Sequence, residues 1–161
     1  ATSLSQVLLQ QFAELKNQKK EILPVFKKVV LFLLIGGGME ILFFFFWSED
    51  LFSFVFGNEW SKSGTLTAIL VFSYAVKFVV SPLSGVFIVF EKLKWASVWQ
   101  SMYFIFIMAL FFLKVEWNVF FVVLIGIDIL AYGIYFAMIS WVIRNYQYEL
   151  SGNYNGRDEK K

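Results

Sequence analysis

Four long apolar runs take up most of this 161-residue chain. They cover residues 29–47, 66–90, 97–113 and 119–143. A helix that crosses a bilayer needs about 20 predominantly apolar residues. An open strand cannot take this place, because lipid offers no hydrogen-bond partner to unpaired backbone groups. The sequence therefore predicts an all-α integral membrane protein with about four transmembrane helices.

Composition and charge narrow the class of protein further. Hydrophobic residues make up 59% of the chain and charged residues 16%, whereas soluble domains average about 25% charged residues. A net charge of +2 is too small to indicate nucleic acid as a partner. Cys and His are absent from the sequence, which removes thiol nucleophiles, zinc sites and the usual proton-transfer base. The Gly36–Gly38 run lies inside a span and follows no strand, so it is not a phosphate-binding loop. We expect neither an enzyme nor a bound cofactor.

The distribution of positive charge predicts how the chain is oriented. Lys and Arg concentrate before the first run, between the second and third runs, and after the fourth: Lys16, Lys19, Lys20, Lys27, Lys28, then Lys92 and Lys94, then Arg144, Arg157, Lys160 and Lys161. Cytoplasmic segments carry such an excess, so four spans place both ends of the chain in the cytoplasm. The third run is short, and a re-entrant or buried helix is the alternative there, but it would break this charge pattern.

The ends of the chain differ from the middle. Residues 1–28 join an apolar stripe at helical spacing to a basic segment; the stripe is Leu4, Leu8, Phe12 and Leu15. This pattern predicts either an amphipathic helix on the inner membrane surface or the cytoplasmic end of a preceding span. Residues 29–143 form the transmembrane region, and residues 144–161 a cytoplasmic polar tail.

Three ionisable residues lie near the middle of three of the runs: Glu40, Lys77 and Asp128. A charge at the bilayer centre costs about 2.5–3.5 kcal/mol on insertion scales, so each needs a partner or a task. We therefore expect the substrate pathway or the coupling site among these residues and their polar neighbours.

Lys77 has the clearest setting of the three. Ser73, Lys77 and Ser81 recur at i, i+4 and i+8 and form one stripe on a helix. Pro82 follows and is expected to kink that helix, because it lacks a backbone donor. A kinked helix with a polar stripe and a cation is typical of the wall of a transport cavity. The alternative is that Lys77 only pairs with Glu40 or Asp128 to hold the bundle together.

The two acids have simpler surroundings. Glu40 follows three glycines, which allow close helix approach or a local break. Asp128 shares a helix face with Tyr132 and Tyr135, at i+4 and i+7. An intramembrane acid that can be protonated would couple transport to a proton, or it would be structural. The sequence leaves both roles open for Asp128.

One series of short motifs resembles a known family. Phe56-Gly57-Asn58-Glu59-Trp60 is followed by Ser63-Gly64, then by Ser81-Pro82-Leu83-Ser84, Glu91-Lys92 and Gln100. The order and spacing resemble the C-terminal half of polysaccharide flippases, O-antigen and teichuronic-type exporters among them, of the multidrug/oligosaccharidyl-lipid/polysaccharide (MOP) exporter superfamily. Those proteins carry a pattern FG-x-x-W-x-x-x-G in an outer loop, which Gly57, Trp60 and Gly64 match, and then an SPLS kink, which Ser81, Pro82 and Ser84 match.

The resemblance implies a fold, a place and a substrate. The fold is MATE-like, with twelve helices in two lobes around a cavity. This chain would supply about the last four of those helices. The remaining N-terminal helices of the transporter would be its partners. Four helices cannot form that cavity alone, so the chain would be a piece of a larger protein or assemble with other chains. The place is the bacterial cytoplasmic (inner) membrane. The substrate is a polyprenyl-diphosphate-linked oligosaccharide, a repeat unit for O-antigen of lipopolysaccharide or a similar polysaccharide, flipped by alternating access.

Two other functions fit the same residues. The first is a multidrug or cation antiporter of the same fold. The second is a four-helix membrane scaffold subunit without a transport cycle, in which the three intramembrane charges would pair statically. Replacement of those charges by swapped or neutral pairs would separate transport from scaffolding.

Overall fold

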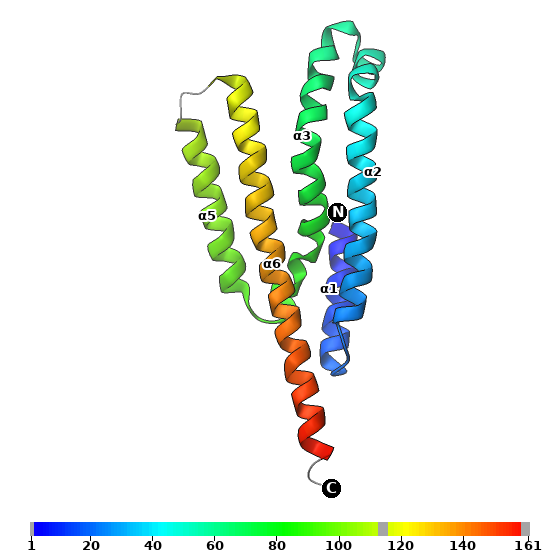
Figure 1. Ribbon diagram of the computed structural model, residues 1–161, viewed down its shortest axis with the longest axis vertical. Coiled ribbons are helices and arrows are strands. Elements are labelled where there is room, and N and C mark those ends of the chain that lie inside the picture. The colour runs from blue at the N-terminus through cyan, green and yellow to red at the C-terminus, as the bar shows by residue number, and fades with distance from the viewer. Residues whose placement is uncertain (1, 113–115, 159–161) are drawn as a thin grey trace.

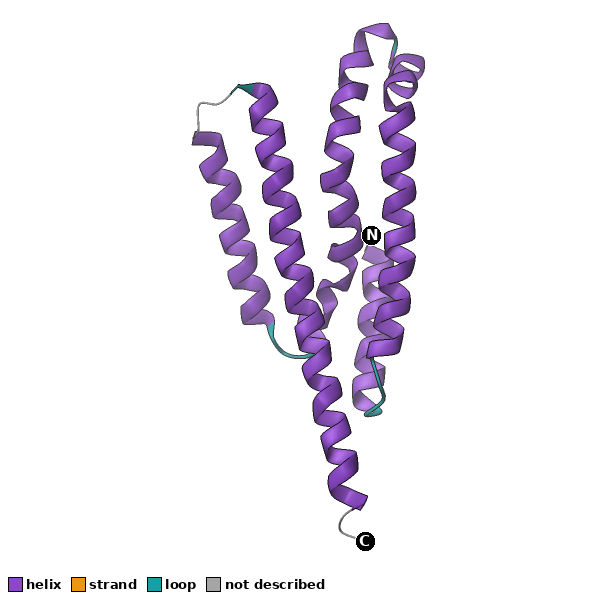
Figure 2. Cartoon of the chain, viewed as in Figure 1, coloured by secondary structure: helices purple, strands orange, loops and turns teal. Residues whose placement is uncertain are grey.

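The computed structural model describes residues 2–112 and 116–158, which form helices and short turns with no strand among them. The elements are α1 (Thr2–Asn17), α2 (Leu23–Phe56), the 3₁₀ helix η1 (Asn58–Trp60), α3 (Ser61–Val80), the 3₁₀ helix η2 (Ser81–Gly85), α4 (Val86–Val89), α5 (Leu93–Phe112) and α6 (Trp117–Asp158). The predicted all-α class is confirmed, and Figure 2 shows it along the whole described chain.

Four helical segments are long and apolar enough to cross a membrane, which confirms a multi-pass membrane protein. Their bounds are Leu23–Phe56, Asn58–Val89, Leu93–Phe112 and Val119–Ser151. The third, α5, has 20 residues, which gives it a length of about 30 Å, close to the thickness of the hydrocarbon core. Within α5 only Leu110 is buried by other parts of the described chain.

The helices extend beyond the predicted spans. α2 continues through residues 48–56 and α3 begins at Ser61, so most of the predicted loop 48–65 is helical. Gly57 ends α2 with φ 97°, a conformation that favours glycine, and its N–H donates to the Ser53 carbonyl. α6 continues to Asp158 through most of the predicted polar tail. Apolar composition marks where a helix meets lipid, but backbone hydrogen bonding can continue the helix into water.

Two helical hairpins form the framework. In Figure 1, α2 and α3 lie side by side and antiparallel, and α5 and α6 form a second antiparallel pair. We call the end that carries the α2–α3 turn the Gly57 end, and the opposite end, where α4 leads into α5, the Glu91 end. α3 packs along α6, and α5 contacts mainly α6. In the view of Figure 1 the two hairpins diverge toward the Gly57 end.

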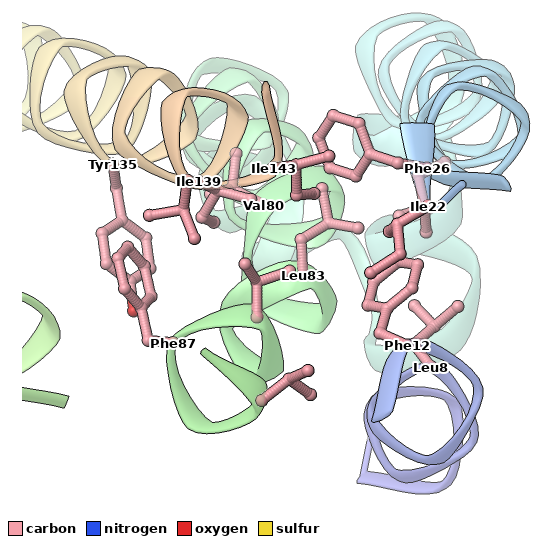
Figure 3. Close-up of a cluster of buried hydrophobic side chains, with 14 of the residues drawn as sticks. Leu8, Phe12, Ile22, Phe26, Val80, Leu83, Phe87, Tyr135, Ile139 and Ile143 are labelled. Carbon is pink, nitrogen blue, oxygen red and sulfur yellow. The ribbon is translucent and has the colours of Figure 1, made fainter. Parts of the chain in front are cut away.

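The apolar core lies toward the Glu91 end, where α1, α2, the end of α3, η2, α4 and α6 meet. Figure 3 shows its largest members, which come from segments far apart in sequence: Leu8, Phe12, Ile22, Phe26, Val80, Leu83, Phe87, Tyr135, Ile139 and Ile143. The ring of Phe26 stacks on Phe136 with centroids 6.1 Å apart, and Phe87 stacks on Tyr135 at 5.2 Å. These contacts join the two hairpins in the half of the bundle nearest the Glu91 end.

α1 is part of this core. Leu8 and Phe12 are buried in it, and the helix packs mainly against η2 and α4. The Lys16 ammonium donates to the Val89 carbonyl at 2.6 Å and lies 5.3 Å from the centre of the Phe90 ring. The apolar stripe of residues 1–28 therefore packs on protein along the bundle. The preceding span that the sequence suggested stays a prediction.

The predicted kink at Pro82 is present. α3 ends at Val80, the chain passes through η2, and α4 follows as a single turn. The Ser81 N–H still donates to the Lys77 carbonyl, and Pro82, which has no N–H, breaks the series at the next residue. Leu83 and Gly85 of this irregular segment are buried, and Gly85 lies against Leu9 of α1. The kink thus makes room for α1 to dock.

Candidate functional site

Asp128 is the centre of a polar cluster inside the bundle. Its carboxylate is 1% exposed and accepts hydrogen bonds from three side chains. The Lys77 ammonium donates to Oδ2 at 2.6 Å, the Ser73 hydroxyl donates to the same oxygen, and the Tyr103 hydroxyl donates to Oδ1 at 2.6 Å. We call these four residues the Asp128 cluster. It joins α3, α5 and α6 at one point.

Local helix geometry explains why the cluster forms. Ser73 and Lys77 are four residues apart on α3, so they lie one above the other on the face toward α6. A carboxylate accepts hydrogen bonds at both oxygens, and charge-assisted bonds are about twice as strong as neutral ones. Burial of an ion pair stabilises a fold only when further hydrogen bonds satisfy the charges. Ser73 and Tyr103 supply those bonds to Asp128.

Lys77 differs from Asp128 in its access to the surroundings. Its side chain is 28% exposed, whereas that of Asp128 is 1% exposed. The ammonium lies 5.8 Å from the centres of both the Tyr74 and the Tyr132 rings, a distance at which a cation is attracted to an aromatic face. The cation therefore has one buried anionic partner, two aromatic faces and one open side.

An aromatic group connects α5 and α6 beside the cluster. Trp99 stacks on Tyr135 with ring centroids 4.0 Å apart and on Tyr103 at 5.4 Å, and Tyr132 meets it edge-on at 5.2 Å. The Trp99 indole N–H donates to the Ala131 carbonyl at 2.9 Å. These rings and the Tyr103 hydrogen bond help to dock α5 on α6, together with the ring contacts of Trp95 with Trp141 and of Phe111 with Phe120.

The structure brings together some of the predicted site residues and separates others. Ser73, Lys77 and Asp128 meet, whereas Ser81, the last member of the stripe, is not among the side chains that donate to Asp128. Glu40 is partly exposed on α2 and forms no ion pair with any residue of 2–112 and 116–158. Of the two acids offered as partners for Lys77, Asp128 is the one it contacts.

Two members of the site were not predicted. Tyr103 and Trp99 lie in the third run, which carries no charge, and reasoning from charge alone passed over them. A signal was present in their spacing, because residues four apart on a helix share a face. The same spacing relates Asp128 to Tyr132 on α6. Trp99 and Tyr103 on one helix, and Asp128 and Tyr132 at the same spacing on the next, would have indicated a contact between the two helices.

The residues of the family-like motif occupy structural positions. Gly57 ends α2, Trp60 ends η1 and is 51% exposed, and Pro82 and Ser84 lie in η2. Gly64 lies against the backbone of α2, where the Ser48 hydroxyl donates to the Gly64 carbonyl at 2.8 Å. These residues shape the α2–α3 hairpin and its kink and do not touch the Asp128 cluster directly.

A cleft lies near the Gly57 end, between α3 and α6. It has a volume of about 440 Å³, with Lys62, Thr65 and Ile69 on one wall and Phe121 and Val122 on the other. These α3 residues precede Ser73 along the helix, so the cleft lies between the Gly57 end and the Asp128 cluster. Within the described parts of the chain, no group of His, Cys, Asp and Glu residues could hold a metal ion.

Comparison of the chain with protein-family models, with curated proteins and with solved structures finds no match.

Proposed function

We propose that this chain is part of a transporter that flips a lipid-linked oligosaccharide, a polysaccharide repeat unit, across the bacterial cytoplasmic membrane by alternating access. The observation that carries the proposal is the Asp128 cluster. Charged groups at that depth are expensive, and here they hold one membrane hairpin to the other. The motif from Gly57 to Ser84 supports the same family of exporters and the MATE-like two-lobed fold, with further N-terminal helices as partners.

The mechanism uses the open side of Lys77. A diphosphate that reached Lys77 from the cytoplasmic side would compete with Asp128 for the ammonium, since both are oxygen anions. Release of the Lys77–Asp128 bond would weaken the contact between the hairpins and let them rock apart around the bound head group. The aromatic faces of Tyr74 and Tyr132 would keep the cation in place during the exchange. This is transport without a catalytic step.

Export in cells tests the proposal. In a strain that depends on this chain for surface polysaccharide, Lys77→Ala should lower surface polysaccharide at least about tenfold, because a hydrogen bond to a charged group contributes about 1.5–3 kcal/mol. Lys77→Arg should keep part of the activity, since it keeps the cation. Lys94→Ala, which removes an exposed lysine away from the cluster, is the matched control and should export normally. Normal export by Lys77→Ala at normal abundance would remove Lys77 from the mechanism.

A scaffold subunit without transport is the second candidate, because Asp128 offsets the charge of Lys77 in a closed pair. The two roles differ in the variant Lys77→Met/Asp128→Leu. Static pairing predicts that this neutral pair restores both abundance and cell-surface polysaccharide. Transport predicts that abundance returns while export stays absent and lipid-linked oligosaccharide accumulates.

The orientation is tested separately. The excess of Lys and Arg at the Glu91 end favours a cytoplasmic position for that end and for the C-terminus. The predicted cytoplasmic N-terminus does not follow, because α1 begins partway along the bundle and runs toward the Glu91 end (Figure 1). The chain has no Cys, so single cysteines at Asn58 and Lys94 can be labelled with an impermeant thiol reagent. We expect the first to react from outside intact cells and the second only after permeabilisation. Labelling of both from one side would contradict the four-span arrangement.

A further inference from the structure

An apolar groove of about 440 Å³ lies between α2, α3 and α6. Its walls include Leu34 and Gly38 of α2, Ala75 and Val79 of α3, and Gly133 and Phe136 of α6. The volume falls within the range of about 300–1,000 Å³ typical of small-ligand sites. A Cβ atom added to Gly38 or Gly133 would meet no atom within 4 Å, so both glycines border open space.

Two cations continue the walls of this groove toward the Glu91 end. Lys27 precedes Val30, which lines the groove, by three residues on α2, and Arg144 follows Phe136 by eight residues on α6. Spacings of three, four, seven and eight residues keep side chains on one helix face. The Phe26–Phe136 stacking holds these parts of α2 and α6 beside each other.

The two side chains also lean toward each other. Side chains on a helix tilt toward its N-terminus, and α2 and α6 run in opposite directions (Figure 1). Lys27 therefore leans toward the Glu91 end, and Arg144 leans back toward the groove. Both are exposed, and neither forms an ion pair with another described residue. The two cations thus lie beyond the Glu91 end of the groove, about 5 Å past Val30 and about 12 Å past Phe136 along their helices, with no ion-pair partner within the described chain.

We propose that the groove and these two cations bind an anionic phospholipid, with one acyl chain between α2, α3 and α6 and the phosphate between Lys27 and Arg144. Basic sites between transmembrane helices bind anionic lipid head groups. The acyl chains of the surrounding bilayer are available to fill an apolar groove at this depth. A docked apolar helix would fill the groove but leave both cations without a counter-charge. The groove shares Tyr132 with the surroundings of Lys77, but neither Lys77 nor Asp128 lines it, and the proposal does not depend on the proposed transport.

Photocrosslinking in vesicles tests this site. Vesicles that contain the chain carry a photoreactive acyl chain on either phosphatidylglycerol or phosphatidylcholine, and crosslinked residues are mapped by mass spectrometry. Phosphatidylglycerol should label the groove residues of α2, α3 and α6 more than phosphatidylcholine does. Each cation near a membrane surface favours an anionic lipid about fivefold, so Lys27→Ala and Arg144→Ala should each lower groove labelling about fivefold. Lys28→Ala, an exposed neighbour on another face of α2, should leave it unchanged.

A second pair of variants tests the groove itself. Gly38→Leu together with Gly133→Leu places side chains in the open space and should abolish groove labelling. Gly126→Leu is the matched control, because its Cβ also meets nothing within 4 Å and it does not line the groove. Equal labelling by the two lipids, or unchanged labelling in the cation variants, would overturn the proposal. Displacement of phosphatidylglycerol by added polyprenyl diphosphate at equal concentration would also overturn the proposal. The groove would then be a binding site for the polyprenyl carrier.

Discussion

Asp128→Ala is expected to lower the free energy of unfolding by about 3 kcal/mol, because it leaves the partner cation without its anion. Removal of one member of a buried ion pair costs about 3–5 kcal/mol, and the 28% exposure of the Lys77 side chain places the effect at the lower end of that range. The hydroxyls of Ser73 and Tyr103 lose their acceptor as well. Thermal unfolding of the purified protein in detergent, followed by circular dichroism, measures the loss.

Two variants divide this effect into its parts. Tyr103→Phe removes only the bond to Oδ1 and should cost about 1.5–3 kcal/mol, as other hydrogen bonds to charged groups do. Lys77→Met/Asp128→Leu removes both charges and should recover much of the stability lost in Asp128→Ala, because no unpaired ion remains. An Asp128→Ala protein that unfolds at the wild-type temperature would show that the cluster does not hold the hairpins together.

Gly64→Ala is expected to be comparably destabilising, although it adds a single methyl group. A Cβ at Gly64 would lie 2.5 Å from the Glu49 Cα and 2.6 Å from the Ser48 carbonyl oxygen, and both are backbone atoms that cannot turn aside. The two helices must separate, and the buried Ser48 hydrogen bond to the Gly64 carbonyl is lost. Overpacking and a lost buried hydrogen bond each cost about 1–3 kcal/mol, so a total of about 3 kcal/mol is expected.

The matched control for this variant lies in the same hairpin. Gly38→Ala adds the same methyl group to α2 where nothing lies within 4 Å, and it should raise stability by about 0.5–1 kcal/mol because alanine favours a helix over glycine. Ser48→Ala isolates the hydrogen bond and should cost about 1 kcal/mol. Equal unfolding temperatures for Gly64→Ala and Gly38→Ala would contradict the close contact of α2 and α3.

Comparison of Gly64→Ala with Lys77→Arg also separates effects on the fold from effects on function. Gly64 belongs to the motif that resembles the flippase family, yet its contacts are with the backbone of α2. Loss of export in Gly64→Ala should therefore follow its loss of abundance. Lys77→Arg keeps the cation but changes its shape, so its export should fall further than its abundance does. A parallel fall in both variants would favour the scaffold role.

Reasoning from the sequence identified the membrane class, the four spans and the helix break at Pro82. Each of these follows from local chemistry: the thickness of the hydrocarbon core sets the length of an apolar run, and proline lacks a backbone donor. The shared face of Asp128 and Tyr132 also followed from helical spacing alone. Span boundaries were less accurate, because helices such as α2 and α6 continue into polar sequence beyond the apolar runs.

Only the tertiary structure decided which charges meet. Lys77 and Asp128 are separated by 51 residues and Tyr103 and Asp128 by 25, and no local rule chooses among distant partners. Glu40 was an equally good partner for Lys77 in sequence, but the packing of α3 along α6 turns Lys77 toward Asp128. The docking of α1 against the Pro82 kink was settled in the same way, by the fit of Leu8 and Phe12 into a core built from α2, α3, η2, α4 and α6. A side chain's depth in the membrane is fixed by its own helix, whereas its partner is fixed by how all the helices pack.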